Sequence, residues 1–370
     1  MSRLALAEAG TAALLLDLQS LGLRLEDSEV GVTGRRGGAG PSDHKAVNFA
    51  GRTVMIPIAT ASACDSPFVA SRPDQYGISV IRRDGIEVSH IEFPRQPRFY
   101  ELKTEDGIAY SQIATLHSSD VLATTLLQSC IRYGNRKTSC QFCAIGQSLV
   151  AGNTILRKTP EQLAEVAKAA VELDGVKHMV MTTGTPNLTD RGAALLCESA
   201  QAVKAAVDLP IQGQCEPPDD DLWFQRMKAC GIDSLGMHLE AVTPAVRERI
   251  MPGKAGVPLA RYMDAFDAAV KVFGRGQVST YILAGLGDTA EAILDVSQHL
   301  IAKGVYPFVV PFVPITGTPL ENHPAPTPAF MAQILPPLGA MLKQARLLSQ
   351  DIKAGCAKCG ACSALASYEV

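Results

Sequence analysis

The sequence predicts an α/β fold: a parallel barrel or partial barrel of six β–α units, with smaller segments on either side. Two observations predict it. Between about residues 120 and 320, short apolar runs alternate with amphipathic runs of helical length. Before residue 118 the apolar runs are short and follow one another without long helices, and after residue 326 the chain ends in closely spaced cysteines. We therefore expect a module at 1–118, a barrel at 119–325 and a tail at 326–370.

The barrel elements follow from hydrophobic periodicity. Strand-like runs lie at 122–128, 176–183, 210–214, 234–239, 277–284 and 308–314, and helical runs at 160–173, 191–207, 219–230 and 289–303. Thr159 suits a helix N-cap and Pro160 suits the first helical position. Ligands of such barrels bind at the carboxyl ends of the strands, so functional residues are expected directly after these runs.

The flanking segments give weaker patterns. An opening helix precedes a Gly/Arg-rich loop at 34–41, in which Arg35 and Arg36 could bind a carboxylate or phosphate or could simply be solvated. Strand-like runs at 54–58, 77–81, 86–93 and 109–115 predict a small strand-rich α+β module, with a hairpin turn at Arg83-Asp84-Gly85. Residues 327–351 are expected to form a helix interrupted by Pro336 and Pro337.

Composition narrows the class of protein. The chain has 370 residues, of which 47% are hydrophobic and 19% charged, with a net charge of −3. These values are typical of a globular protein and give no indication of nucleic-acid or membrane binding. Glu8 and Asp17 interrupt and end the apolar start, so we expect an amphipathic helix there rather than a signal peptide. No apolar window is long enough to span a membrane, and a cytoplasmic location is expected.

The ten cysteines are unevenly distributed. Six fall in two groups, Cys130/Cys140/Cys143 and Cys356/Cys359/Cys362, whereas the other four are scattered. A secreted disulfide framework would spread them through a short chain. Tight groups in a long chain instead indicate metal or iron–sulfur ligation.

The first group follows the first predicted strand, at the ligand-binding end of the barrel. Nine residues separate Cys130 from Cys140, and two separate Cys140 from Cys143. Three thiolates can bind three irons of a cubane and leave the fourth iron open for an external ligand, as a catalytic cluster requires. A structural zinc site completed by a distant His or Cys is the alternative.

This group resembles the signature of the radical S-adenosylmethionine (SAM) superfamily, C-x3-C-x2-C after the first strand of a partial (β/α)6 TIM-like barrel. The second half is kept as Cys140-Gln141-Phe142-Cys143, while the first gap is six residues longer. The likeness is strongest to members similar to biotin synthase and lipoyl synthase, and to a bacterial group associated with nitrilase gene clusters. It implies a [4Fe–4S] cluster and SAM as cofactors, with Phe142 beside them.

Motifs after later strands extend the resemblance. The stretch Thr183-Gly184-Thr185 matches the backbone that meets the SAM amine, and Gly285 lies in an element like the one beside the adenine. The string at 235–243 is similar to the strand that binds the SAM ribose, which implies that role for His238 and Glu240. Period-two spacing also places these two side chains on one strand face. An interior pair in which they satisfy each other is the alternative.

Two further elements complete the match. Arg261 or Lys254 is implied as a partner of the SAM carboxylate, and either could instead be a surface base. The stretch at 313–320 resembles the P-x-x-G-T-P-L element of biotin-synthase-like members. The order of all these motifs along the six strands carries the resemblance.

The second group, at the C-terminus, has the spacing C-x2-C-x2-C. Cys356, Cys359 and Cys362 suit a cubane, so we expect an auxiliary [4Fe–4S] cluster. Its fourth ligand would be Cys64, Cys215 or a substrate atom. Zinc binding and a disordered tail with free thiols are the alternatives.

The resemblance implies an enzyme that reductively cleaves SAM to a 5′-deoxyadenosyl radical, which abstracts hydrogen from a small-molecule substrate. An anionic substrate and an electron donor of the flavodoxin or ferredoxin type are the expected partners. The sequence assigns no catalytic side chain. A zinc-binding barrel with a hydrolytic or binding role, and a radical SAM enzyme acting on peptide or RNA, stay open. Aromatics at 5% and the lack of a basic stripe argue against RNA.

Overall fold

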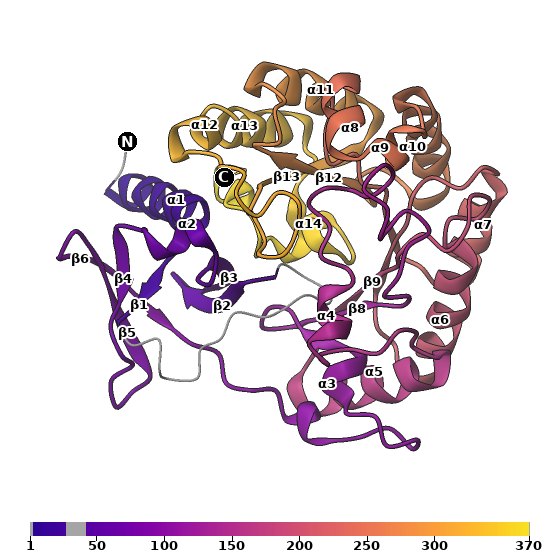
Figure 1. Cartoon of the computed structure of the whole chain (residues 1–370), viewed down its shortest axis with the longest axis horizontal. Coiled ribbons are helices and arrows are strands. Elements are labelled where there is room, and N and C mark those ends of the chain that lie inside the picture. Colours follow the sequence, from indigo (N-terminus) through magenta and orange to yellow (C-terminus); the bar gives the residue numbers. More distant parts are fainter. Residues whose placement is uncertain (1–2, 27–41, 370) are drawn as a thin grey trace.

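The computed structural model describes residues 3–26 and 42–369. It contains two sheets, one in an N-terminal module and one in a larger curved layer, with the C-terminal tail between them (Figure 1). The loop with Arg35 and Arg36 lies outside the described residues. Within those residues, no helix has the length and apolar character to cross a membrane.

The larger sheet is the predicted partial barrel, and that prediction is confirmed. Its strand order is β13-β12-β11-β10-β9-β8-β7, with parallel pairing from β8 to β13 and β7 antiparallel to β8. The edge strands β7 and β13 are at opposite ends of this order, so the sheet curls without closing. The strands are β7 (Thr115–Leu116), β8 (Val121–Thr125), β9 (His178–Thr182), β10 (Ile211–Gln214), β11 (Ser234–Gly236), β12 (Val278–Ala284) and β13 (Val305–Pro311).

Helices cover the outer face of this sheet (Figure 1). They are α5 (Pro160–Asp174), α6 (Ala193–Ala206), α7 (Leu222–Ala229), α10 (Leu259–Phe273) and α11 (Ala290–Lys303). Thr159 caps α5 as predicted: its side chain accepts from the Gln162 N–H, and the Gln162 side chain accepts from the Thr159 N–H. Short helices α4 (Gln147–Val150), α8 (Pro244–Ile250) and α9 (Pro252–Ala255) lie in the connections after β8 and β11.

The N-terminal module packs α1 (Arg3–Leu21) against a six-stranded sheet of order β1-β4-β5-β6-β2-β3. The predicted hairpin is confirmed, because Asp84 (φ 50°) and Gly85 (φ 86°) form the turn that pairs Arg83 with Ile86. The strands are β1 (Arg24–Leu25), β2 (His44–Phe49), β3 (Arg52–Pro57), β4 (Phe68–Ala70), β5 (Ile78–Arg83) and β6 (Ile86–Glu92), and α2 (Ala61–Cys64) follows β3.

One predicted strand of the module is wrong. Residues 109–115 form helix α3 (Tyr110–Ile113), and only Thr115 and Leu116 become extended, as β7. Tyr110 and Ile113 are both buried, as a three-residue spacing on one helix face allows. β7 pairs with β8, so this segment joins the barrel sheet instead of the N-terminal sheet.

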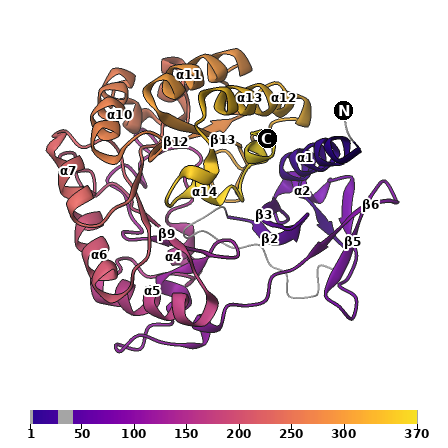
Figure 2. The same ribbon diagram turned by 180° about the vertical axis from the view of Figure 1, so that it is seen from behind.

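The part of the C-terminal tail around α14 lies inside the curve of the large sheet, whereas α12 and α13 lie outside it, near α11 (Figures 1 and 2). After α12 (Pro328–Ala332), Pro336 and Pro337 lie in the first turn of α13 (Leu335–Ala345), where missing N–H groups cost nothing, so the predicted break falls just before them. The turn η2 (Ser349–Asp351), the helix α14 (Cys356–Cys359) and the turn η3 (Leu365–Tyr368) follow. Hydrogen bonds from Gly355 N to His178 Nδ1 (3.3 Å) and from Cys356 N to Gln212 Oε1 (3.2 Å) attach α14 to the start of β9 and to β10.

Candidate functional site

The predicted Gly-rich motif after β9 holds the chain that leads to Cys130. Leu126 N donates to Thr182 O (2.8 Å), Gly184 N to Leu127 O (3.0 Å) and Ile131 N to Thr185 O (3.0 Å). A Cβ on Gly184 would overlap the carbonyl oxygen of Ser129. Only glycine therefore lets the segment before Cys130 lie against the end of β9.

The long gap between Cys130 and Cys140 is folded against α8 and α9. Gln141 N donates to Ile250 O (2.8 Å), and Gly253 N donates to Thr138 O (3.1 Å). A side chain on Gly253 would collide with that Thr138 carbonyl. The extra residues thus form an ordered loop that packs on the connection after β11.

A buried ion-pair network fixes the same loop from the other side. Arg132 pairs with Glu216, which also accepts from Thr185 Oγ1 (2.7 Å) and pairs with Arg191 (3.4 Å). Burial by itself would raise the pKa of Glu216, but the charges of Lys254 and Arg132 outweigh it and leave that pKa below its ordinary value. The carboxylate is therefore ionised and joins the loop to the end of β10.

The three cysteines of the first group are partly buried in this loop and act on one another electrostatically. Burial, and to a smaller degree the charge of Glu240, raises the pKa of Cys140. Burial raises the pKa of Cys143 to about 11, and the charge of Cys130 adds to the effect. Thiols gathered in this way ionise readily only beside a cation, so the donor set suits a metal centre.

A chamber of about 300 Å³ is lined by all three tail cysteines and reaches Phe142, which lies between two cysteines of the first group. Phe142, from between Cys140 and Cys143, lines it together with Thr182, His238 and Glu240 from the carboxyl ends of the strands. The tail contributes Cys356, Cys359 and Cys362 to the same walls, and the N-terminal module contributes Gln19, His44 and Met55. The chamber is thus built from all three parts of the chain.

His238 and Glu240 both line the chamber, although β11 ends earlier than predicted, at Gly236. Glu240 has φ 63° and pairs with Lys254 over 2.6 Å. Tyr281 N donates to His238 Nδ1 (3.2 Å), and burial lowers the pKa of His238 to about 3. The ring is therefore neutral with its hydrogen on Nε2, which makes it a hydrogen-bond donor.

Other predicted site residues do not line the chamber. Arg261 pairs with Asp221 (2.7 Å) and the Pro218 carbonyl, outside the chamber walls, so Lys254 is the base that the structure brings to Glu240. Gly285 is covered by Pro326 at the end of β12. Gly184 and Thr185 hydrogen-bond the segment around Cys130, and the Thr183 side chain donates to the Gly184 carbonyl oxygen.

The tail cysteines receive hydrogen bonds from the barrel. Gln214 Nε2 donates to Cys356 Sγ over 3.1 Å, and His117 Nε2 lies 3.4 Å from Cys362 Sγ. The Ser118 side chain hydrogen-bonds Cys359, and the Tyr281 side chain hydrogen-bonds Cys362. Burial raises the pKa of Cys356 to about 12. Sulfurs surrounded by donors are arranged as thiolate ligands are.

These hydrogen-bond partners of the tail cysteines were not predicted from the sequence. Gln212 and Gln214 are two residues apart on β10, so both side chains lie on the same face of this buried strand. Polar side chains at such buried positions are unusual, and they were the sequence signal that could have identified these two residues. The role of residues 117–120 was not predicted because these residues form the turn between β7 and β8, and this hairpin was not expected from the sequence. His44 was also missed. It is buried, its Nδ1 lies 2.6 Å from the Ser42 carbonyl oxygen, and burial lowers its pKa to about 4.

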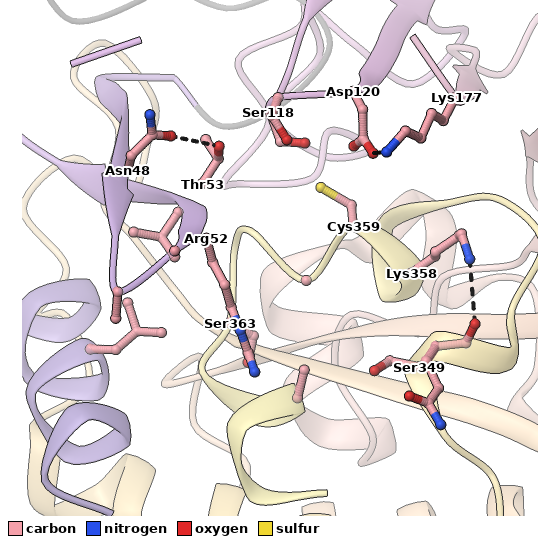
Figure 3. Close-up of a pocket in the computed structure, with 18 of the residues that line it drawn as sticks. Asn48, Arg52, Thr53, Ser118, Asp120, Lys177, Ser349, Lys358, Cys359 and Ser363 are labelled. Carbon is pink, nitrogen blue, oxygen red and sulfur yellow. Dashed lines mark hydrogen bonds and ion pairs between the residues drawn. The ribbon is translucent and has the colours of Figure 1, made fainter. Parts of the chain in front are cut away.

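The tail also borders a second, larger cleft of about 1300 Å³ between the N-terminal module and the amino ends of the strands (Figure 3). Basic residues Arg52, Lys177 and Lys358 line it, and Lys177 pairs with Asp120 over 3.6 Å. Cys359 lines both the cleft and the chamber. The tail is therefore the wall between the two spaces.

All ten cysteines lie in the described part of the chain and are free thiols. Cys64 is exposed in α2, and Cys215 is buried near Cys197 and Arg191, away from the chamber. Across residues 3–26 and 42–369, no three His, Cys, Asp or Glu side chains converge as a single metal ion would require.

Comparison with known proteins shows what the central part of this chain is similar to. A sequence model described as the radical SAM superfamily matches residues 131–300. The bacteriochlorophyllide c C-7(1)-hydroxylase of Chlorobaculum limnaeum is 26% identical over 54% of this chain and 54% of its own length. The lipoyl synthase of Marinobacter nauticus is 24% identical over 63% of this chain and 71% of its own.

Among solved structures, methylornithine synthase is similar with a TM-score of 0.49 and 18% identity, over 73% of this chain and 79% of that one. The chain spans about half the length of the first of these curated relatives, 54%. The matched segment begins directly after Cys130 and includes the cysteine loop, the Gly184 turn, and the strands β11 and β12, which His238 and Gly285 follow. Residues 131–300, which match the radical SAM superfamily model, form a radical SAM domain in this chain.

Proposed function

We propose that this protein is a radical SAM enzyme that acts on a small molecule held in the chamber, between a catalytic cluster on Cys130, Cys140 and Cys143 and an auxiliary cluster on the tail cysteines. One observation carries the proposal. The chamber is lined at one end by Phe142 and Glu240, beside the first cysteine group, and elsewhere by all three tail cysteines. The radical SAM superfamily, whose sequence model matches residues 131–300, uses a [4Fe–4S] cluster and SAM.

The bound cofactors would supply the reductive cleavage of SAM that yields a 5′-deoxyadenosyl radical. The protein's own residues bind and orient. Three thiolates would hold the cluster and leave one iron open, Glu240 would accept hydrogen bonds from SAM hydroxyl groups, and the Nε2–H of His238 would donate one. Lys254 holds Glu240 in place through their 2.6 Å ion pair.

The chamber itself favours a small substrate. Its volume, about 300 Å³, is at the lower end of the range for small-molecule sites. Apolar side chains such as Leu283, Val310 and Phe312 line much of it and keep water from a reactive radical. A peptide or an RNA strand would need an open groove leading to the same point, and the tail occupies the amino-end side of the sheet.

Zinc is less favoured than iron–sulfur clusters. A structural zinc ion needs four donors that converge on one point, and the described residues offer no group of even three. A cubane binds each thiolate at a different iron, so its ligands stand apart. Ten free thiols also suit the reducing cytoplasm, where a flavodoxin or ferredoxin-type protein would supply electrons.

The decisive experiment uses protein purified without oxygen and reconstituted with iron and sulfide. Incubation with SAM and dithionite should release 5′-deoxyadenosine, and a Cys143→Ala variant should release none. A Cys230→Ala variant is the matched control, because Cys230 packs in the core beside Cys197 and should not affect the product. About one zinc per chain with no acid-labile sulfide would contradict the proposal.

A further inference from the structure

The auxiliary cluster of the proposed function has three cysteines and needs a fourth ligand or an open iron. Building on that proposed function, we propose that His44 of the N-terminal module is the fourth protein ligand of the tail cluster, through Nε2. His44 lines the chamber together with Cys356, Cys359 and Cys362. The proposal makes the N-terminal module part of the metal centre.

The hydrogen bond of His44 fixes which ring nitrogen is available. Nδ1 lies 2.6 Å from the Ser42 carbonyl oxygen, and a carbonyl can only accept, so Nδ1 carries the hydrogen. The other nitrogen, Nε2, then presents its lone pair. An imidazole that donates from one nitrogen to a backbone carbonyl and binds metal through the other is the usual arrangement of a histidine ligand.

The backbone brings His44 to the tail. His44 pairs with Pro57 across β2 and β3, and Met55, two residues before Pro57, lies on the same face of that hairpin. Met55 N donates to Ala361 O over 2.8 Å, and Gln19 Nε2 donates to the same oxygen over 3.0 Å. Ala361 lies between Cys359 and Cys362, so the N-terminal module is hydrogen-bonded to the cluster-binding loop itself.

The other candidate ligands fit less well. Cys64 is exposed in α2, and Cys215 does not line the chamber. His238 uses Nδ1 to accept from Tyr281 N and carries its hydrogen on Nε2. His117 Nε2 lies only 3.4 Å from Cys362 Sγ, which is a hydrogen-bonding distance, whereas ligands of different irons in a cubane lie farther apart. His117 is therefore assigned as a hydrogen-bond donor to Cys362.

Four protein ligands have a chemical consequence. A cluster held by three thiolates and an imidazole has no open iron, so the substrate in the chamber would not be bound by iron at the tail. A neutral imidazole in place of a thiolate also makes the cluster less negative, which raises its reduction potential. The tail cluster would then exchange electrons, and Cys359 is exposed to the large cleft where a redox partner has access.

The test uses the full chain with the first cluster removed by Cys130→Ala, Cys140→Ala and Cys143→Ala, so that only the tail cluster is reconstituted. Protein labelled with ¹⁵N-histidine is reduced and studied by pulsed electron paramagnetic resonance. We expect a strong ¹⁵N hyperfine coupling, which His44→Cys should remove while the iron and sulfide content is kept. The same variant should lower the reduction potential. His117→Ala should retain the coupling.

Each other outcome has a definite meaning. Persistence of the coupling in His44→Cys, or its loss in His117→Ala, would show that another histidine is the ligand. If the tail cluster forms but gives no strong nitrogen coupling, no histidine binds its irons. That result would overturn the role of His44 and would leave the proposed function intact. The lack of any acid-labile sulfide in the parent variant would overturn both the tail cluster and the proposal built on it.

Discussion

Gln214, at the end of β10, donates a hydrogen bond from Nε2 to Cys356 Sγ over 3.1 Å. The same amide also donates to Gln212 Oε1 over 2.7 Å, and Gln212 Oε1 accepts from Cys356 N over 3.2 Å. Two glutamines from one barrel strand thus hold the first cysteine of the tail by its backbone and by its sulfur. This relationship links the barrel interior to the redox properties expected of the tail.

Gln214→Leu should lower the reduction potential of the tail cluster, because an N–H group directed at a thiolate stabilises the reduced, more negative state. The iron content should stay the same, since Gln214 is not a ligand. A redox titration followed by electron paramagnetic resonance measures the shift. Gln225→Leu, on the exposed side of α7, is the matched control and should leave the potential unchanged. An unaltered potential in Gln214→Leu would show that the hydrogen bond does not act on the cluster.

Gly184→Ala should disturb the first cysteine group. Its Cβ would overlap the Ser129 carbonyl oxygen, which belongs to the backbone and cannot rotate away. The expected cost is about 2 kcal/mol of unfolding free energy, together with lower iron retention at the first site. Thermal unfolding and iron analysis measure the two effects. Gly10→Ala, where nothing lies within 4 Å of the new Cβ, should be neutral or stabilising.

Arg132→Met should destabilise the protein by about 3 kcal/mol, because it removes one of the two arginines that pair with the buried carboxylate of Glu216 and leaves only Arg191. The cysteine loop should also become more accessible to protease, since Arg132 is its link to β10. Arg136→Met removes an exposed base from the same loop and should change stability by less than about 0.5 kcal/mol. Equal effects of the two variants would show that the buried pair does not hold the loop.

The alternation of apolar runs was enough to predict the six parallel strands, because each strand of a sheet covered by helices carries a strong apolar signal. The positions of Gly184, His238 and Glu240 shortly after strands could also be predicted, whereas their roles in cofactor binding stay predictions. The short strand β7 was not, because its two residues continue from the helix α3 and carry no period of their own.

The residues that surround the tail could not be predicted from local sequence patterns, for a different reason. Gln19, His44 and Met55 reach the chamber only because the N-terminal module docks on the tail, more than 300 positions away along the chain. Arg261 and Lys254 were equivalent as sequence candidates. Tertiary packing separated them by pairing Arg261 with Asp221 and bringing Lys254 to Glu240.

The final prediction concerns acid stability. Burial lowers the pKa of His178 from 6.5 to about 4 in the folded protein, where Nδ1 accepts from Gly355 N. As the pH falls, the unfolded chain therefore binds its proton first, near pH 6.5. The stability due to the neutral ring is present above that pH and is lost as the pH falls towards 4. A shift of this size corresponds to about 3 kcal/mol.

His178→Gln should therefore make the free energy of unfolding less dependent on pH between about pH 4 and pH 6.5. The remaining dependence should include His44 and His238, whose pKa values burial also lowers, to about 4 and about 3. Urea unfolding across this range measures the slope. His299→Gln, at an exposed position of α11, should keep the full slope. A slope as steep in His178→Gln as in the parent protein would show that His178 is not the source of that acid sensitivity.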